Sequence, residues 1–245
     1  MRKRKLVGAI SVILFSVGVL LGVILMGVTV WADLEATLFN PQARQYQPFR
    51  SLRCPIIITP EETGIIRARF KNTLDREIDF FIRAHISHGY VTLRREVITE
   101  LALAPGETER VEWEINAEDA AFERLVLFRM TARGAYPLPN RQGTCGVLLV
   151  ETSSLRGNQI VAILLAGSLV LTLGGGGLWF ATHREMLELQ MQLSRAMGFL
   201  TVSTILGIIV SLMGWWVFGA FFLVVILLAV GVILGYFVNS ETPAA

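Results

Sequence analysis

Hydrophobic residues are gathered in long uncharged blocks, and one polar segment, Asp33 to Arg156, separates the first block from the rest. Leu6 to Trp31 would extend roughly 39 Å as a helix, more than the bilayer core of about 30 Å. Met197 to Val238 would extend roughly 63 Å, which is too long for one crossing. It must turn back, and Gly214-Trp215-Trp216 offers a flexible backbone and interfacial aromatics for the turn. The pattern predicts four transmembrane helices, at residues 6–31, 159–182, 197–213 and 217–238.

The basic start of the chain sets the expected orientation. Residues 2 to 5 are all Arg or Lys, and such clusters stay in the cytoplasm. An uncharged stretch from Leu6 to Trp31 exceeds the usual apolar region of a cleaved signal peptide, so an uncleaved signal anchor is favoured. Cleavage after Val30-Trp31-Ala32 is the alternative. We expect a multi-pass protein of the inner (plasma) membrane with both termini, 1–5 and 239–245, in the cytoplasm. Residues 183–196 would form a cytoplasmic amphipathic loop, 214–216 the outer turn, and 33–156 the extracytoplasmic part.

Within the polar segment the hydrophobic period changes to two. Ile66, Ala68 and Phe70 alternate with polar positions, and the same alternation runs from Ile78 to Ser87. This period is typical of half-buried antiparallel strands. Further strands are expected at 55–59, 90–99, 110–115, 125–132 and 145–151, with turn residues between them. Seven short strands at this spacing predict a β-sandwich over 53–156, preceded by a Pro-containing stalk at 32–52.

One stretch resembles a known kind of module. A strand ending Phe70-Lys71-Asn72, a long alternating strand, and then Leu101-Ala102-Leu103-Ala104-Pro105-Gly106-Glu107-Thr108 look like the immunoglobulin-like modules common on bacterial surface proteins. The resemblance covers about residues 53–152 and implies a fold and an extracytoplasmic setting, not a ligand. The expected fold class is a membrane protein of four transmembrane α-helices, with an extracytoplasmic all-β immunoglobulin-like sandwich inserted between helices 1 and 2.

Both cysteines of the chain, Cys54 and Cys145, lie in the polar segment, one near each end of its expected core. In an oxidising compartment they would form a disulfide. The alternative is two unrelated buried thiols.

The hydrophobic blocks carry aromatic and small residues at informative places. Trp31, Trp215 and Trp216 fall at the expected outer membrane interface, and Trp179 and Tyr236 at the inner one. Small residues four apart share one helix face and allow close packing of helices. This spacing predicts helix packing through Gly18, Gly22, Ser203, Gly207, Ser211, Gly231 and Gly235. The run Gly174 to Gly177 would kink its helix or admit a neighbouring backbone.

The charge balance and the residue motifs bear on which classes of function are possible. The polar segment has nearly equal numbers of basic and acidic residues, so it lacks the basic surface that binds nucleic acid. His85 and His88 could take part in a metal site only with further ligands such as Glu96 or Asp79. No catalytic motif, metal-ligand set or cofactor motif is recognised, so no catalytic residue, metal or cofactor is predicted. The proline-rich loop with Tyr136, Leu138 and Arg141 could contact a partner, or it could simply cover the end of the sandwich.

These patterns predict a non-catalytic anchor or scaffold that presents the exported module to a protein partner. The expected partners are membrane lipid and another membrane or extracytoplasmic protein. The alternative is an accessory subunit of a transporter or channel that docks through its helices, although no Asp, Glu, Lys, Arg or His lies inside the expected spans. A third possibility is an enzyme or metal-binding module in the sandwich loops.

Overall fold

The computed structural model describes residues 2–39, 46–134, 136–182 and 188–241. The chain divides into two compact units. A helical unit comprises Met1–Val30 and Ala162–Ala245, and a β unit comprises Trp31–Val161. The helices are α1 (Arg2–Leu38), α2 (Gly157–Thr182), α3 (Glu188–Leu212) and α4 (Trp216–Glu241). The strands and the one short 3-10 helix are β1 (Gln47–Pro48), β2 (Leu52–Arg53), β3 (Ile57–Ile58), β4 (Gly64–Lys71), β5 (Ile78–His88), β6 (Tyr90–Leu103), β7 (Thr108–Ile115), η1 (Ala117–Asp119), β8 (Ala120–Ala121), β9 (Leu125–Gly134) and β10 (Arg141–Leu149).

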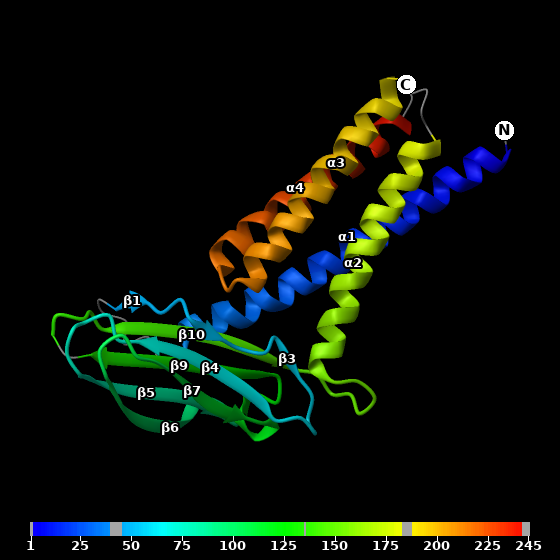
Figure 1. The fold of residues 1–245 in the computed structure, drawn as a ribbon. Coiled ribbons are helices and arrows are strands. Elements are labelled where there is room, and N and C mark those ends of the chain that lie inside the picture. Colours follow the sequence, from blue (N-terminus) through cyan, green and yellow to red (C-terminus); the bar gives the residue numbers. More distant parts are fainter. Residues whose placement is uncertain (1, 40–45, 135, 183–187, 242–245) are drawn as a thin grey trace. The chain divides into compact units, whose positions relative to one another are not determined.

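The β unit consists of two sheets packed face to face (Figure 1). One sheet has the order β1-β10-β9-β5-β6, with β3 and β8 added at its side, and the other has the order β2-β4-β7. Alternate residues of β4 and of the second half of β7 point into the core, which produces the period of two in the sequence. Ring contacts join the two sheets, because the centroids of Trp113 and Phe128 lie 5.2 Å apart. The strand segment is therefore immunoglobulin-like at the level of fold.

A disulfide joins Cys54 to Cys145, as expected, across a sequence separation of 91 residues. Cys145 lies on β10 and is buried, and Cys54 lies just after β2 and packs against the same core. The bond therefore links the first strands of the β unit to its last strand.

The end of α1 is part of the β unit. Ala32, Ala36 and Phe39 are buried against Leu125 and Leu127 of β9. The spacing of four and then three residues places the three on one helix face. Gly146 permits this contact, because a Cβ at residue 146 would lie 2.0 Å from the carbonyl oxygen of Ala32. α1 consequently continues to Leu38, seven residues beyond the helix end expected at residue 31.

The expected fold class is wrong as stated. It placed an all-β sandwich as an insertion between helices 1 and 2, whereas the observed order is one N-terminal helix, the strands, and three C-terminal helices. The β unit is not all-β, because it includes the last turns of α1, η1 and the start of α2. Its larger sheet is also mixed, since β1 and β3 pair with β10 in parallel. The alternation pattern could not reveal these pairings, because β1 and β3 have two residues each.

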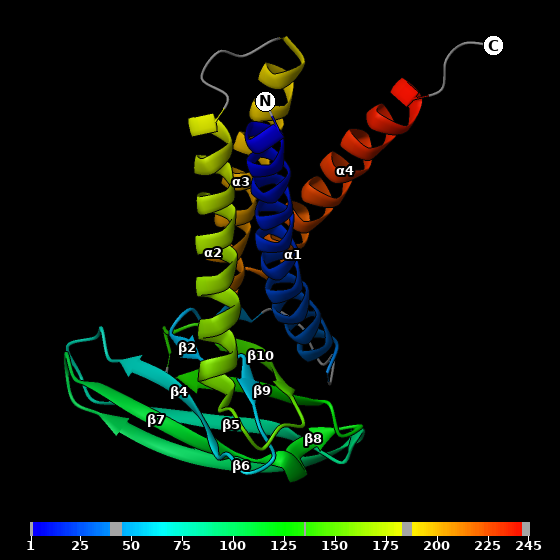
Figure 2. The same ribbon diagram turned by 90° about the vertical axis from the view of Figure 1, so that its right-hand side faces the viewer.

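The helical unit is built on small residues. A Cβ at Gly18 would lie 2.4 Å from the backbone nitrogen of Thr172, and one at Gly175 would lie 2.5 Å from that of Phe15. These two glycines let α1 and α2 approach at backbone distance. α3 and α4 form a helical hairpin through a turn that contains Gly214 at φ +76° (Figure 2). Among the described residues, four helices are long and apolar enough to cross a membrane.

Candidate functional site

A cleft of about 430 Å³ lies between β4 and the start of β10. Arg69, Lys71 and Arg141 bring three positive charges to its wall, and hydroxyl groups of Ser51, Thr73 and Thr108 also line it. Its remaining wall is apolar, formed by Phe80, Leu138 and Pro139. The size falls within the range of small-ligand sites. A ligand or partner segment with negative charge beside an apolar group would complement this cleft.

The loop expected to contact a partner borders the cleft, but its three named side chains differ in exposure. Tyr136 is 88 % exposed, and its carbonyl oxygen accepts a hydrogen bond from the guanidinium of Arg76. Leu138 is half-buried and packs against the core, so it covers the sandwich end. Arg141 is exposed and lines the cleft. Tyr136 and Arg141 are thus accessible to a partner, and Leu138 fixes the loop.

A second, smaller hollow of about 50 Å³ lies on the outer face of β5 and β9. Arg83, Arg129 and Arg133 line it, together with His85 and Tyr46. Sequence reasoning missed this group because it treated the arginines as scattered. The sequence did carry a signal for this group, because residues two apart on a strand lie on the same face. Arg83 and His85 have this spacing, and so do Arg129, Thr131 and Arg133.

The two histidines of the β unit differ in burial. His85 is buried on β5, with its Nε2 atom 3.8 Å from Oε2 of Glu96. Burial lowers the pKa of His85, and the nearby positive charge of Arg94 lowers it further. His88 is exposed at the end of β5. In the described part of the chain, no three His, Cys, Asp or Glu side chains are grouped as metal ligands would be.

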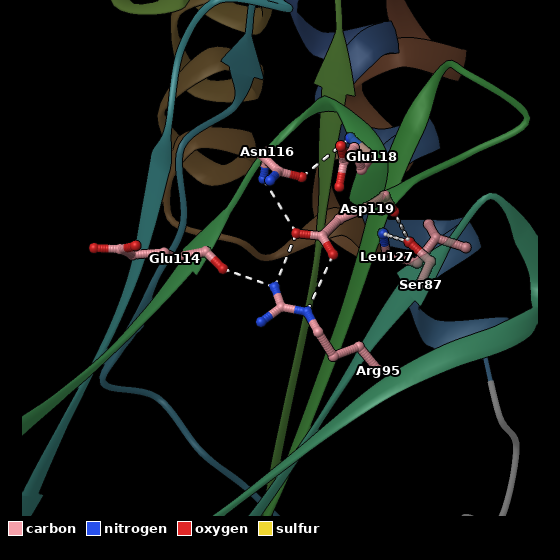
Figure 3. A network of polar contacts seen from close by, with 7 residues as sticks. All are labelled: Ser87, Arg95, Glu114, Asn116, Glu118, Asp119 and Leu127. Carbon is pink, nitrogen blue, oxygen red and sulfur yellow. Dashed lines mark hydrogen bonds and ion pairs between the residues drawn. The ribbon is translucent and has the colours of Figure 1, made fainter.

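A polar network closes the end of the β unit near η1 (Figure 3). The carboxylate of Asp119 is nearly buried and accepts from Nε and Nη2 of Arg95 at 3.2 and 2.9 Å. It also accepts from the backbone N–H of Asn116 at 3.1 Å, while the side chain of Asn116 caps η1. Ser87 donates to the carbonyl of Asp119 and accepts from Leu127 N–H. Because the Asp119 carboxylate and the Ser87 hydroxyl are both taken up by hydrogen bonds between strands and η1, the role of the network is to join these elements rather than to bind a ligand.

In the helical unit, the small residues expected to pack have different surroundings. Gly22 lies against Thr204 and Ser168, and Gly207 against Met26. Ser203 and Ser211 are buried. At Gly231, no atom of the other described elements lies within 4 Å of the position a Cβ would take, and the surroundings of Gly235 lie outside the described residues.

The aromatic residues expected at the membrane interfaces also differ in exposure. Trp31 and Trp215 are exposed, and Trp216 is half-buried. Trp179 is buried, and its indole N–H donates to the hydroxyl of Ser194 at 3.2 Å. The side chain of Tyr236 lies outside the described residues.

Comparison with known proteins finds likeness in fold alone. No protein-family model matches the sequence, and no curated protein matches it either. A CARDB domain from Pyrococcus furiosus, solved in complex with di-metal ions, is 13 % identical, with a TM-score of 0.33 over 41 % of this chain and 90 % of that domain.

Glycoside hydrolases also appear among the similar structures. A β-glucuronidase from Bacteroides uniformis is 17 % identical, with a TM-score of 0.28 over 39 % of this chain and 12 % of that enzyme. A β-glucosidase from Listeria innocua, in complex with glucose, is 16 % identical, with a TM-score of 0.29 over 42 % of this chain and 16 % of that enzyme. This chain therefore spans only a small part of either enzyme. These similarities carry no argument about a ligand, a reaction or a partner.

Proposed function

We propose that this chain is a multi-pass protein of the inner (plasma) membrane that serves as a non-catalytic anchor or scaffold. In this proposal the signal-anchor helix α1 is uncleaved, and the β unit meets a protein partner on the extracytoplasmic side. The four long apolar helices and the disulfide support it, since structural disulfides persist in oxidising compartments.

The observation that carries the proposal is the way the β unit holds two helix ends. At the end of α1, the carboxylate of Asp33 accepts from the N–H of Gly146 at 3.3 Å, and Arg129 donates to the carbonyl of Phe39 at 3.0 Å. At the start of α2, the N–H of Gly157 donates to Glu62 at 2.9 Å. A binding module on a flexible stalk would need none of these contacts. Helix ends fixed in this way favour a scaffold that holds its partner in a defined position.

Labelling of intact cells tests the orientation. Arg110→Cys places a thiol on an exposed position of β7, and Ala245→Cys places one at the C-terminus. We expect a membrane-impermeant maleimide to label residue 110 in intact cells and residue 245 only after lysis. Labelling of residue 245 alone in intact cells would refute the proposed orientation.

Photo-crosslinking then tests which surface meets the partner. A photoreactive residue at Tyr136 should give a discrete product in native membranes, because this side chain is 88 % exposed and its loop contributes Leu138 and Pro139 to the cleft. The same residue at exposed Glu109 on β7 serves as the control.

A specific observation keeps the transport-accessory role as the second candidate. In α4, 11 % of the most hydrophobic window is buried, so most of this helix could contact lipid or a partner helix. Discrete crosslinks from Val224 and Leu228, with none from Tyr136, would favour that role over the scaffold. Both helix positions are exposed large hydrophobic residues.

A further inference from the structure

Arg129 is a buried cation held by neutral groups. Its side chain is among the most buried in the β unit, at 2 % exposure. Nη1 donates to the carbonyl oxygen of Phe39 at 3.0 Å, and Nη2 donates to Oε1 of Gln142 at 2.8 Å. No carboxylate among the described residues forms an ion pair with it, although a buried charge is usually paired. Burial accordingly lowers the pKa of its guanidinium.

The pairing of β5 with β9 brings two more arginines to the same face. In this register Arg83 is opposite Thr131, His85 is opposite Arg129, and Phe81 is opposite Arg133. Arg129 and Arg133 are therefore the diagonal neighbours of Arg83, and such positions lie about 7–8 Å apart. Long side chains at that separation can converge on one point. All three arginines line the hollow of about 50 Å³ above Thr131.

The positive charge of this group is only partly compensated. Nε of Arg83 pairs with Oε1 of Glu96 at 2.8 Å, and within the described residues this is the one ion pair that the three guanidinium groups form. Like charges on neighbouring sheet positions destabilise each other. An anion bound between them would remove that repulsion and give Arg129 the charged partner it lacks.

We propose that the hollow formed by Arg83, Arg129, Arg133 and Thr131 binds a phosphate group. Three guanidinium groups approaching from different strand positions suit the several acceptor oxygens of phosphate better than the two oxygens of a carboxylate. A hollow of about 50 Å³ exceeds the roughly 10–15 Å³ that one water needs on the same measure, and it suits one compact anion.

Two sources could supply this phosphate. Phe39, whose carbonyl Arg129 binds, lies eight residues after Trp31, or roughly 12 Å along a helix. A phospholipid headgroup is therefore one source, and that source rests on the proposed membrane location. A soluble phosphate compound is the other.

Binding to the full chain in an uncharged detergent tests the site itself. Inorganic phosphate should raise the unfolding temperature more than acetate does at equal ionic strength. Arg83→Gln and Arg133→Gln, which alter exposed side chains, should each weaken phosphate binding roughly tenfold, the loss expected for a charged hydrogen bond. Arg110→Gln, an exposed arginine of the other sheet, is the matched control and should bind as the wild type does. Equal stabilisation by acetate, or wild-type phosphate affinity in both hollow variants, would overturn the proposal.

Nanodiscs then distinguish the two sources. The chain is reconstituted in phosphatidylcholine with and without phosphatidylglycerol, and retained lipid is measured by native mass spectrometry. Phospholipid that is retained by the wild type and lost in Arg133→Gln assigns the site to a headgroup. Phosphate binding at unchanged affinity in both lipid compositions assigns it to a soluble compound. Neither result would refute the site, whereas a reversed outcome of the labelling experiment would remove only the headgroup source.

Discussion

Two buried charges of the β unit, Asp119 and Arg129, are held in opposite ways. Asp119 receives two hydrogen bonds from Arg95 and one from the backbone of Asn116, so its charge is compensated within the fold. In the described part of the chain, Arg129 donates its side-chain hydrogen bonds to the carbonyl oxygen of Phe39 and the amide oxygen of Gln142. Charged partners make the stronger hydrogen bonds. Asp119 is therefore a structural residue, and Arg129 is one whose charge remains available to an anion.

Removal of the Asp119 carboxylate should loosen the end of the β unit. We expect Asp119→Ala to lower the free energy of unfolding by roughly 2–3 kcal/mol, because it removes the charged hydrogen bonds from Arg95 and the capping-box bond from the Asn116 backbone N–H. Hydrogen exchange of the β6 and β9 amides, followed by mass spectrometry, measures the change. Glu118→Ala is the matched control, because the exposed Glu118 contributes only its backbone N–H to the cap. Equal protection in the two variants would show that the network does not stabilise this end.

At the scale of elements, the strands were more predictable than the end of the first helix. The long strands β4, β5 and β7 lie where alternation predicts them, because buried and more exposed residues alternate along β4, along the first half of β5 and along the second half of β7. α1 was predicted too short, because Asp33 and Glu35 end the uncharged block. The missed signal was the helical spacing of Ala32, Ala36 and Phe39, which continues through those charges. Their buried positions explain why the helix continues.

A methyl group at Gly146 should separate α1 from the sheet. The Cβ of Gly146→Ala would lie 2.0 Å from a backbone carbonyl that cannot rotate away. We therefore expect the free energy of unfolding to fall by roughly 2–3 kcal/mol or more. Faster hydrogen exchange of residues 31–39 would measure it. Gly143→Ala on the same strand is the control, since its Cβ would meet the side chain of Leu52 at 3.0 Å, and that side chain can move. Similar exchange in both variants would mean that the α1 contact contributes little to stability.

At the scale of the whole molecule, hydropathy located the apolar helices, but the sequence could not locate the sites. The arginine hollow depends on which residue of β5 faces which residue of β9, and these lie more than 40 positions apart. The larger cleft likewise joins Arg69 of β4 to Arg141 of β10. The register between strands this far apart in the sequence cannot be predicted from a local pattern of residues. The two cysteines were the exception, because a single pair of cysteines has only one possible connection.

The disulfide between Cys54 and Cys145 should contribute much of the stability of the β unit. It closes a loop with a separation of 91 residues, for which chain entropy gives about 4–5 kcal/mol. We expect the double variant Cys54→Ser, Cys145→Ser to be cleaved by protease at a much lower urea concentration than the wild type. Wild-type protein kept in reducing agent is the control, and it should behave as the double variant does. If reduction leaves the urea dependence unchanged, packing of the two sheets alone holds the ends of the β unit together, and the bond is dispensable for stability.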